Sequence, residues 1–171
     1  MDSLIQQIEK AFASRSYPGD DNLTHCSYDR KYGGAYDGPC WECQEMAEFF
    51  RGKPWRTLRA RELRRYGDAD ALFTIDAYSY FLPAYLLEAV RNPGELDVCV
   101  DHLTYRFGPK AEDQFGCERL AAILKALCDA ELFALVNYFR FALSREQDWD
   151  GYCERSVQNV ARELSMRPKT N

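Results

Sequence analysis

The stretch at residues 74–91, TIDAYSYFLPAYLLEAVR, constrains the fold most, because it is apolar on nearly every side. One row of apolar side chains at spacings of three and four consists of Ile75, Tyr78, Leu82, Leu86 and Ala89. A second row, on another face, consists of Ala77, Phe81, Ala84 and Leu87. A helix that is apolar all round belongs in the middle of a bundle. The sequence therefore predicts a central helix enclosed by amphipathic partners.

A membrane span is the alternative interpretation of this stretch, and the residues argue against it. Asp76, Ser79 and Pro83 interrupt the apolar run, which is barely long enough to cross a bilayer. Pro83 removes one internal hydrogen bond and bends a helix, which neighbouring helices can support. We therefore expect a buried helix of a soluble bundle and no contact with a membrane.

Length and composition favour one domain. A chain of 171 residues with 46% apolar content fits a single domain over residues 1–171 with one core, and residues 166–171 are expected to be frayed. The first residues carry no basic region followed by an apolar run, so we expect a cytoplasmic protein. The seven cysteines are odd in number and irregularly spaced, as is typical of reduced, buried thiols.

Amphipathic patterns predict further helices on both sides of the central one. They cover residues 4–14, 40–51 and 58–66, a long region from 111 or 117 onward with a break near 128–131, and a last helix before Pro168. The helix at 40–51 has a core stripe of Cys43, Met46, Ala47 and Phe50, and Gly52 is expected to end it. The predicted fold class is mainly α, a single-domain helical bundle.

Two segments lack the helical period. Residues 15–39 are rich in Gly, Pro, Asp, Asn and Tyr and predict a long irregular loop, which in a compact domain is usually functional or disordered. In residues 96–107, Leu96, Val98 and Val100 alternate with polar residues, and the alternation resumes in the opposite phase after His102. This pattern predicts a short extended segment.

Acidic and tyrosine residues of the loop and of the following helix form a candidate partner-binding surface. Tyrosine offers contact area at a low cost in rotamer entropy, which explains its frequency in binding surfaces. The candidate residues are Asp20, Asp21, Tyr28, Asp29, Tyr32, Tyr36, Glu42 and Glu45. The alternative is structural: the rings cover the core, and Glu42, Glu45 and Glu48 are a solvated helix face.

Metal and catalytic motifs are weak. His25, Cys26, Cys40 and Cys43 could supply a tetrahedral zinc site, but Cys43 lies on the core stripe and adjacent ligands rarely serve one ion. The Cys-x-x-Cys spacing also allows a redox motif, although the strand–helix pattern of a thioredoxin-like fold is missing. The sequence contains neither a nucleophile elbow nor a glycine-rich phosphate loop. We therefore predict no catalytic residue, no metal and no cofactor.

A basic segment at residues 51–65 contrasts with a chain whose net charge is −5 and whose pI is about 5.1. The segment contains seven basic residues and one acidic residue, Glu62, and Trp55 and Tyr66 are close by in the sequence. Such a run could touch phosphate or a nucleic-acid strand. The acidic balance of the whole chain argues against general nucleic-acid binding, and we favour an exposed helix that neutralises its acidic neighbour.

Four short motifs occur along the chain: PGDDNL from Pro18, WEC from Trp41, FxGKxW from Phe50 and YFLPAYL from Tyr80. They resemble motifs of a family of small bacterial proteins catalogued as a domain of unknown function. The resemblance covers residues 4–107 with the motifs in the same order, and the last third is looser. It implies a bacterial, cytosolic, single-domain protein and supplies no catalytic residues.

Three functional hypotheses follow from these features. The first is a non-enzymatic immunity protein that neutralises a cognate toxin, because an acidic, tyrosine-rich surface is complementary to the basic cleft of a toxin acting on nucleic acid. The second is a metal-dependent enzyme that uses Glu42 and Glu45 with His25 or His102. The third is a nucleic-acid accessory protein that uses the basic segment 51–65.

Overall fold

The computed structural model of the chain describes residues 2–24, 40–67, 71–96, 98–145 and 151–168. These ranges are mainly helical, and their β structure is a single bridge between Thr24 and Phe73, so the predicted mainly α bundle is confirmed. The α-helices and the 3₁₀ helices (η) are, in chain order, α1 Asp2–Ala11, η1 Asp20–Asn22, α3 Trp41–Phe50, η2 Trp55–Thr57, α4 Ala60–Arg64, α5 Ile75–Arg91, α6 Pro93–Leu96, α7 Val98–Phe107, α8 Gln114–Ala126, α9 Asp129–Ser144 and α10 Tyr152–Met166.

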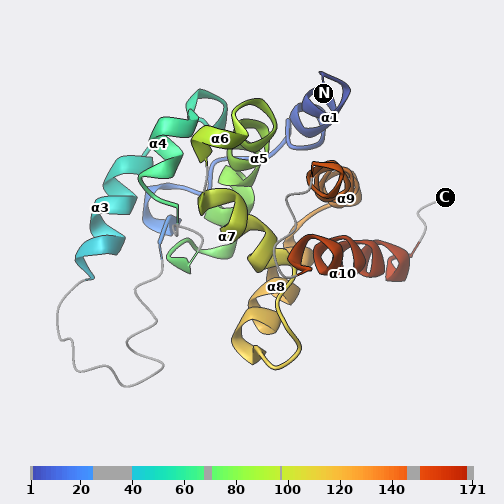
Figure 1. Cartoon of the computed structure of the whole chain (residues 1–171). Helices are drawn as coiled ribbons and strands as arrows, with labels where there is room; N and C mark the ends of the chain where they lie inside the picture. Colours follow the sequence, from blue (N-terminus) through green and yellow to red (C-terminus); the bar gives the residue numbers. More distant parts are fainter. Residues whose placement is uncertain (1, 25–39, 68–70, 97, 146–150, 169–171) are drawn as a thin grey trace.

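Helix α5 is the predicted central helix. Thr74 caps it, since its Oγ1 accepts a hydrogen bond from the Ala77 N–H at 3.1 Å. Every side chain from residue 77 to 90 is buried. Helices α1, α4, α6, α7 and α8 contact α5, which lies in the middle of the molecule (Figure 1). The prediction of an apolar helix enclosed on all sides is confirmed.

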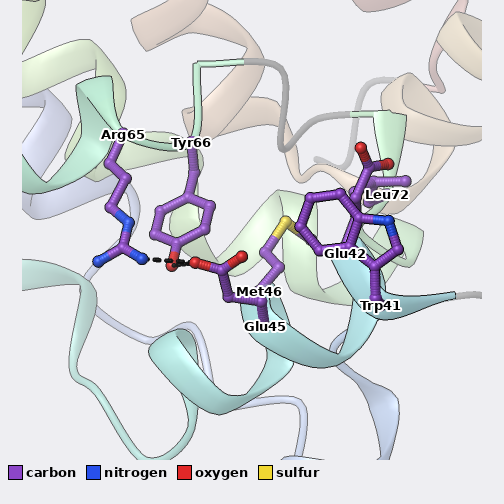
Figure 2. Close-up of a pocket in the computed structure, with 7 residues that line it drawn as sticks. All are labelled: Trp41, Glu42, Glu45, Met46, Arg65, Tyr66 and Leu72. Carbon is purple, nitrogen blue, oxygen red and sulfur yellow. Dashed lines mark hydrogen bonds and ion pairs between the residues drawn. The ribbon is translucent and has the colours of Figure 1, made fainter.

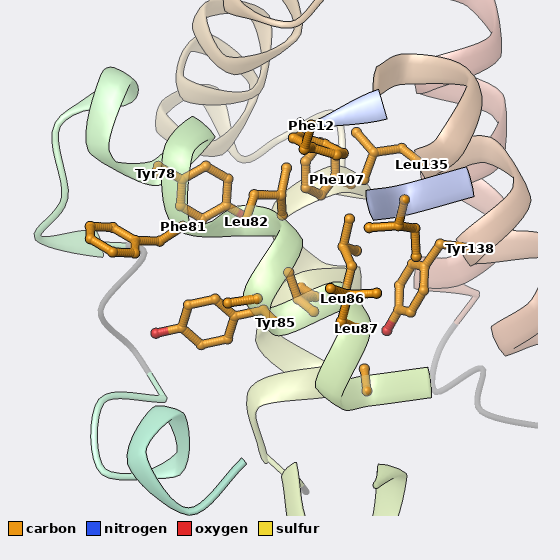
Figure 3. Close-up of a cluster of buried hydrophobic side chains, with 14 of the residues drawn as sticks. Phe12, Tyr78, Phe81, Leu82, Tyr85, Leu86, Leu87, Phe107, Leu135 and Tyr138 are labelled. Carbon is orange, nitrogen blue, oxygen red and sulfur yellow. The ribbon is translucent and has the colours of Figure 1, made fainter. Parts of the chain in front are cut away.

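The core is continuous around α5. Leu82 and Leu86 of α5 belong to one buried cluster with Phe107 of α7 and with Leu135 and Tyr138 of α9 (Figure 3). Fully burying one such side chain stabilises a fold by about 1.5–3 kcal/mol. The hydrophobic effect therefore holds the amphipathic helices against α5 from several sides.

The predicted extended segment 96–107 is wrong, because its described residues are helical: α6 ends at Leu96 and α7 covers Val98–Phe107. Apart from Arg106, the buried residues of this region are Leu96, Cys99, Val100, Leu103, Thr104 and Phe107. Their spacings of three and four are those of a helix. The alternation arose from counting Cys99 and Thr104 as outward polar residues, although both are buried.

The chain before α3 runs alongside that helix in the opposite direction. The Gly52 N–H, just past the end of α3, donates to the Tyr17 hydroxyl at 2.8 Å, and the Thr24 hydroxyl donates to the Cys43 carbonyl at 3.4 Å. Residues 15–24 are irregular apart from η1, while residues 25–39 of the predicted loop lie outside the described ranges. Gly52 has a φ of 64° and ends α3 as predicted.

Helices α9 and α10 pack together, with α1 against α9 and α7 against α10 (Figure 1). The predicted break near residues 128–131 is confirmed, since α8 ends at Ala126 and α9 begins at Asp129. After α10, the Arg167 guanidinium donates to the carbonyls of Leu124 and Leu127. Among the described helices, none is both long and apolar enough to cross a membrane.

Candidate partner-binding site

The first turn of α3 presents a tryptophan to solvent. Cys43, Met46 and Phe50 form the buried stripe of this helix, as the sequence predicted. Trp41 falls outside that stripe, and 68% of its surface is exposed, the largest fraction among the large hydrophobic side chains of the described residues. Exposing an indole to this extent forgoes most of the stabilisation that its burial would contribute.

Trp41 borders a pocket of about 170 Å³ between α3 and the chain that follows α4. Figure 2 shows Trp41 at the end of the pocket nearest the start of α3, with Arg65 and Tyr66 at the opposite end. The remaining lining residues are Glu42, Glu45, Met46 and Leu72. Pockets for small-molecule ligands typically measure about 300–1,000 Å³. This smaller hollow suits a single inserted side chain.

The two predicted carboxylates of the pocket differ in their surroundings. Arg65 donates to Glu45 across the pocket, as the dashed line in Figure 2 marks. Glu42 is exposed and forms no hydrogen bond or ion pair with another described residue. Burial raises the pKa of the Tyr66 phenol, although the Arg65 charge beside it acts in the opposite direction. Because Glu42 is exposed and Glu45 already binds Arg65, a partner can reach the Glu42 carboxylate directly. It can bind Glu45 only by displacing Arg65.

The predicted residues Asp20 and Asp21 lie apart from this pocket. Both are exposed in η1, and Asp20 accepts a hydrogen bond from the Tyr17 hydroxyl at 2.7 Å. Because the same hydroxyl binds Gly52, this pair lies near the end of α3, about 15 Å along the helix from Glu42. The other four predicted residues, Tyr28, Asp29, Tyr32 and Tyr36, lie outside the described residues.

The residues proposed for metal chemistry divide in the same way. In the described part of the chain, no group of three or more His, Cys, Asp or Glu side chains is arranged to hold a metal ion. Glu42, Glu45 and His102 are therefore not gathered into such a group. Two of the four residues considered for zinc, His25 and Cys26, lie outside the described residues.

The arginines of the basic segment 51–65 are exposed, although part of the segment is buried. Arg51, Arg56, Arg59, Arg61, Arg64 and Arg65 all face solvent. Arg56 lies over the ring of Trp55 at 4.1 Å, and that ring is only 2% exposed. The Arg59 guanidinium donates to the carbonyls of Arg56 and Leu58. With Trp55 buried, this segment offers charge without an exposed tryptophan on which a base could stack.

Trp41 is the site residue that the candidate surface omitted. The signal was present, since a tryptophan lies two positions before Cys43 and does not fit the stripe of Cys43, Met46, Ala47 and Phe50. An apolar residue out of register with the buried face of its helix is expected to be exposed. Counting carboxylates alone overlooked it.

The chain belongs to DUF6714, a family of unknown function, whose profile matches residues 1–162. Comparison with curated proteins found no match, and comparison with solved structures found none either.

Proposed function

We propose, since membership of DUF6714 assigns no activity, that this protein is a non-enzymatic binding protein that recognises a basic protein through the start of α3. The observation that carries the proposal is the exposed Trp41 beside the exposed Glu42 carboxylate, which pairs with no other described residue, at the rim of a pocket sized for one side chain. Tryptophan is enriched among the residues that dominate binding energy in protein interfaces.

A lysine or arginine of the partner fits this arrangement of groups. Its cationic end can lie against the face of the Trp41 indole, a contact worth about 0.5–2 kcal/mol, and can pair with the Glu42 carboxylate. An arginine that enters further can also replace Arg65 as the partner of Glu45. The surface therefore favours a basic side chain over an acidic or purely apolar one.

The finer form of the proposal is an immunity protein that blocks a cognate toxin. The net charge of −5, together with the exposed Asp20, Asp21 and Glu42, supports fast, electrostatically steered association with a basic cleft. A toxin that acts on nucleic acid needs such a cleft to bind its substrate. An acidic protein that fills the cleft excludes the substrate and requires no catalysis of its own.

Co-expression tests this form directly. The native host's proteins are captured on the immobilised chain, and each captured protein is expressed alone and together with the chain. An immunity protein restores growth that its partner arrests, and Glu42→Lys reduces this rescue. Glu112→Lys is the matched control, because it makes the same charge change at an exposed residue outside the pocket. A partner without effect on growth contradicts the immunity role, and equal rescue by both variants contradicts the surface.

Nucleic-acid binding through the basic segment 51–65 is the second candidate, favoured by the exposure of six arginines. The test is the affinity of a labelled RNA or DNA strand at increasing salt. Binding through phosphate contacts weakens steeply as salt rises, and Arg61→Glu weakens it further. An affinity that neither salt nor this substitution changes contradicts the candidate.

A further inference from the structure

The cysteines that flank Trp41 and Glu42 occupy specialised positions at the start of α3. Cys40 is the N-cap of the helix, and its Sγ accepts a hydrogen bond from the Cys43 N–H at 3.4 Å. The sulfur of Cys40 therefore lies over the first turn of α3, against the backbone of Cys43. This contact joins the two cysteines of the Cys-x-x-Cys motif within one turn of the helix.

The two thiols differ in accessibility. Cys40 is half-buried, whereas only 2% of the Cys43 surface is exposed. Side chains three residues apart in a helix are about 5–6 Å apart at Cβ, and a disulfide needs about 3.5–4.5 Å. Since the N-cap residue lies outside the helical conformation, with φ −55° and ψ 114°, a small rotation there can close the gap. A reagent can reach Cys40 first, and Cys43 lies behind it.

We propose that Cys40 and Cys43 form a thiol–disulfide exchange site, in which Cys40 attacks an external disulfide and Cys43 resolves the product. The Cys40 thiolate attacks one sulfur of glutathione disulfide, forms a mixed disulfide and releases one glutathione thiolate. The Cys43 sulfur then attacks the Cys40 sulfur, which forms the Cys40–Cys43 disulfide and displaces the second glutathione. The Cys43 proton passes to the departing glutathione thiolate. The dithiol loses two electrons and two protons, and glutathione disulfide is reduced to two glutathione molecules.

The two cysteines at the start of α3 do not depend on a thioredoxin-like fold for their arrangement. A Cys-x-x-Cys motif was disfavoured because the strands of a thioredoxin-like fold are missing. The exchange chemistry itself requires an accessible thiol and a second thiol near enough to attack the mixed disulfide. At the start of α3, Cys40 is half-buried and Cys43 follows one turn later. The inference is independent of the proposed binding function, since it involves the thiols and not the Trp41 or Glu42 side chains.

Helix α9 provides an internal control. Cys128 is the N-cap of α9 and is exposed, so a disulfide reagent can reach it. Three residues later the chain has Glu131 in place of a second cysteine. Cys128 can therefore form a mixed disulfide with glutathione but has no resolving thiol in the next turn. Comparing the products formed at Cys128 and at Cys40 therefore distinguishes a thiol that is merely accessible from a pair that exchanges its disulfide.

The experiment equilibrates the full chain with mixtures of glutathione and glutathione disulfide, quenches it with acid, alkylates the remaining thiols and maps the peptides by mass. We expect both thiols of the Cys40–Cys43 peptide to lose alkylation together, through an internal disulfide. Cys128 should instead carry glutathione. In Cys43→Ser, the mixed disulfide on Cys40 should accumulate, because the resolving thiol is absent. In Cys40→Ser, which keeps an effective N-cap, Cys43 should remain reduced.

Three results would overturn the proposal. The first is a wild-type chain in which Cys40 retains glutathione as Cys128 does. The second is a Cys40–Cys43 pair that stays fully alkylatable under conditions that modify Cys128. The third is one zinc ion per purified chain that protects both thiols from alkylation, because the pair would then be part of a metal site. Circular dichroism of both serine variants verifies that they fold.

Discussion

At the scale of single residues, an ion pair with a buried carboxylate joins distant parts of the chain. Arg15, in the segment after α1, donates to both carboxylate oxygens of Glu131 in α9, at 2.6 and 2.7 Å. Glu131 is 2% exposed and also accepts from the Cys128 N–H at 2.7 Å. The Glu131 carboxylate thus accepts hydrogen bonds both from the Arg15 guanidinium and from the backbone N–H at the start of α9. Its removal leaves the Cys128 N–H without this acceptor and leaves the Arg15 guanidinium with only the Ala126 carbonyl among these contacts.

We predict that Glu131→Ala lowers the free energy of unfolding by about 3 kcal/mol, the cost of breaking one side of a buried pair. Urea denaturation measures it. Glu9→Ala is the control, since Glu9 and its partner Arg91 are 44% and 34% exposed and a surface pair contributes at most about 1 kcal/mol. Equal losses in the two variants would contradict a structural role for the Arg15–Glu131 pair.

Tyr138 gives a second prediction at this scale. Its side chain is 1% exposed, and its hydroxyl has no hydrogen-bond partner among the described residues. Deleting an unpaired buried hydroxyl removes a desolvation cost, so Tyr138→Phe should leave stability at pH 7 unchanged or raise it by about 1 kcal/mol. A loss larger than about 1 kcal/mol would mean that the hydroxyl is satisfied.

The same variant has a pH signature. Burial raises the pKa of the Tyr138 phenol far above its usual value of about 10. As pH rises past the usual pKa of about 10, the unfolded chain releases this proton while the native chain retains it. The stability of the native state therefore falls as pH rises. Tyr138→Phe should therefore lose less stability than the wild type between about pH 9 and 11. Parallel losses would contradict the raised pKa.

At the scale of elements, Gly108 allows the end of α7 to approach the start of α10. A Cβ built on Gly108 would lie 2.3 Å from the Tyr152 carbonyl oxygen, which is backbone and cannot rotate away. Nearby, the Ser156 hydroxyl donates to the Thr104 carbonyl at 3.0 Å. A side chain at Gly108 therefore forces the two helices apart and strains this contact.

Gly108→Ala is predicted to lower the unfolding free energy by about 2 kcal/mol, in the range of overpacked sites. Gly94→Ala is the matched control, because a Cβ there meets no atom within 4 Å and alanine favours the helix. The control should be neutral or slightly stabilising. If thermal and urea unfolding place both variants at the wild-type value, the close approach of α7 and α10 is incorrect.

Whether the sequence predicted a helix correctly depended on which of its side chains are buried. The fully apolar stretch 74–91 has one solution in a helical protein, and α5 matches it. Helix α7 was mistaken for an extended segment because Cys99 and Thr104, both buried, read as polar in an alternating pattern. Periodicity over a dozen residues cannot separate the two when small, weakly polar side chains face the core.

The candidate site was less predictable, for a related reason. Sequence reasoning identified Glu42 and Glu45 as surface acids, and both line the pocket. It could not identify that Arg65, twenty residues later, pairs with Glu45, because such a pairing depends on how α4 returns to α3. Trp41 could have been found from its register alone, whereas the pocket beneath it required the tertiary arrangement.

At the scale of the whole molecule, charge is unevenly distributed. Seven bases and one acid give residues 51–65 a formal charge of +6, so the remainder of a chain with total −5 carries −11. Attraction between this acidic remainder and a basic partner is long-ranged and is screened by salt. Association with the proposed partner should therefore slow as salt rises.

We also predict one cooperative unfolding transition, because the helices share one core around α5. Circular dichroism at 222 nm follows the helices of the whole chain. Tryptophan fluorescence follows the surroundings of the indole rings, including Trp55, which is buried in η2. Both signals should give the same midpoint in urea. Two separate midpoints would mean that the chain contains independent folding units.

The central claim is that the start of α3 binds a basic protein, and the affinity of a purified captured partner for two alanine variants tests it most directly. Trp41→Ala should weaken binding by at least about 2 kcal/mol, roughly thirtyfold, as expected for a tryptophan that anchors an interface. Phe133→Ala, which removes a 50% exposed ring from α9, should leave the dissociation constant unchanged. Equal affinity of the wild type and Trp41→Ala, measured by titration calorimetry, would contradict the claim.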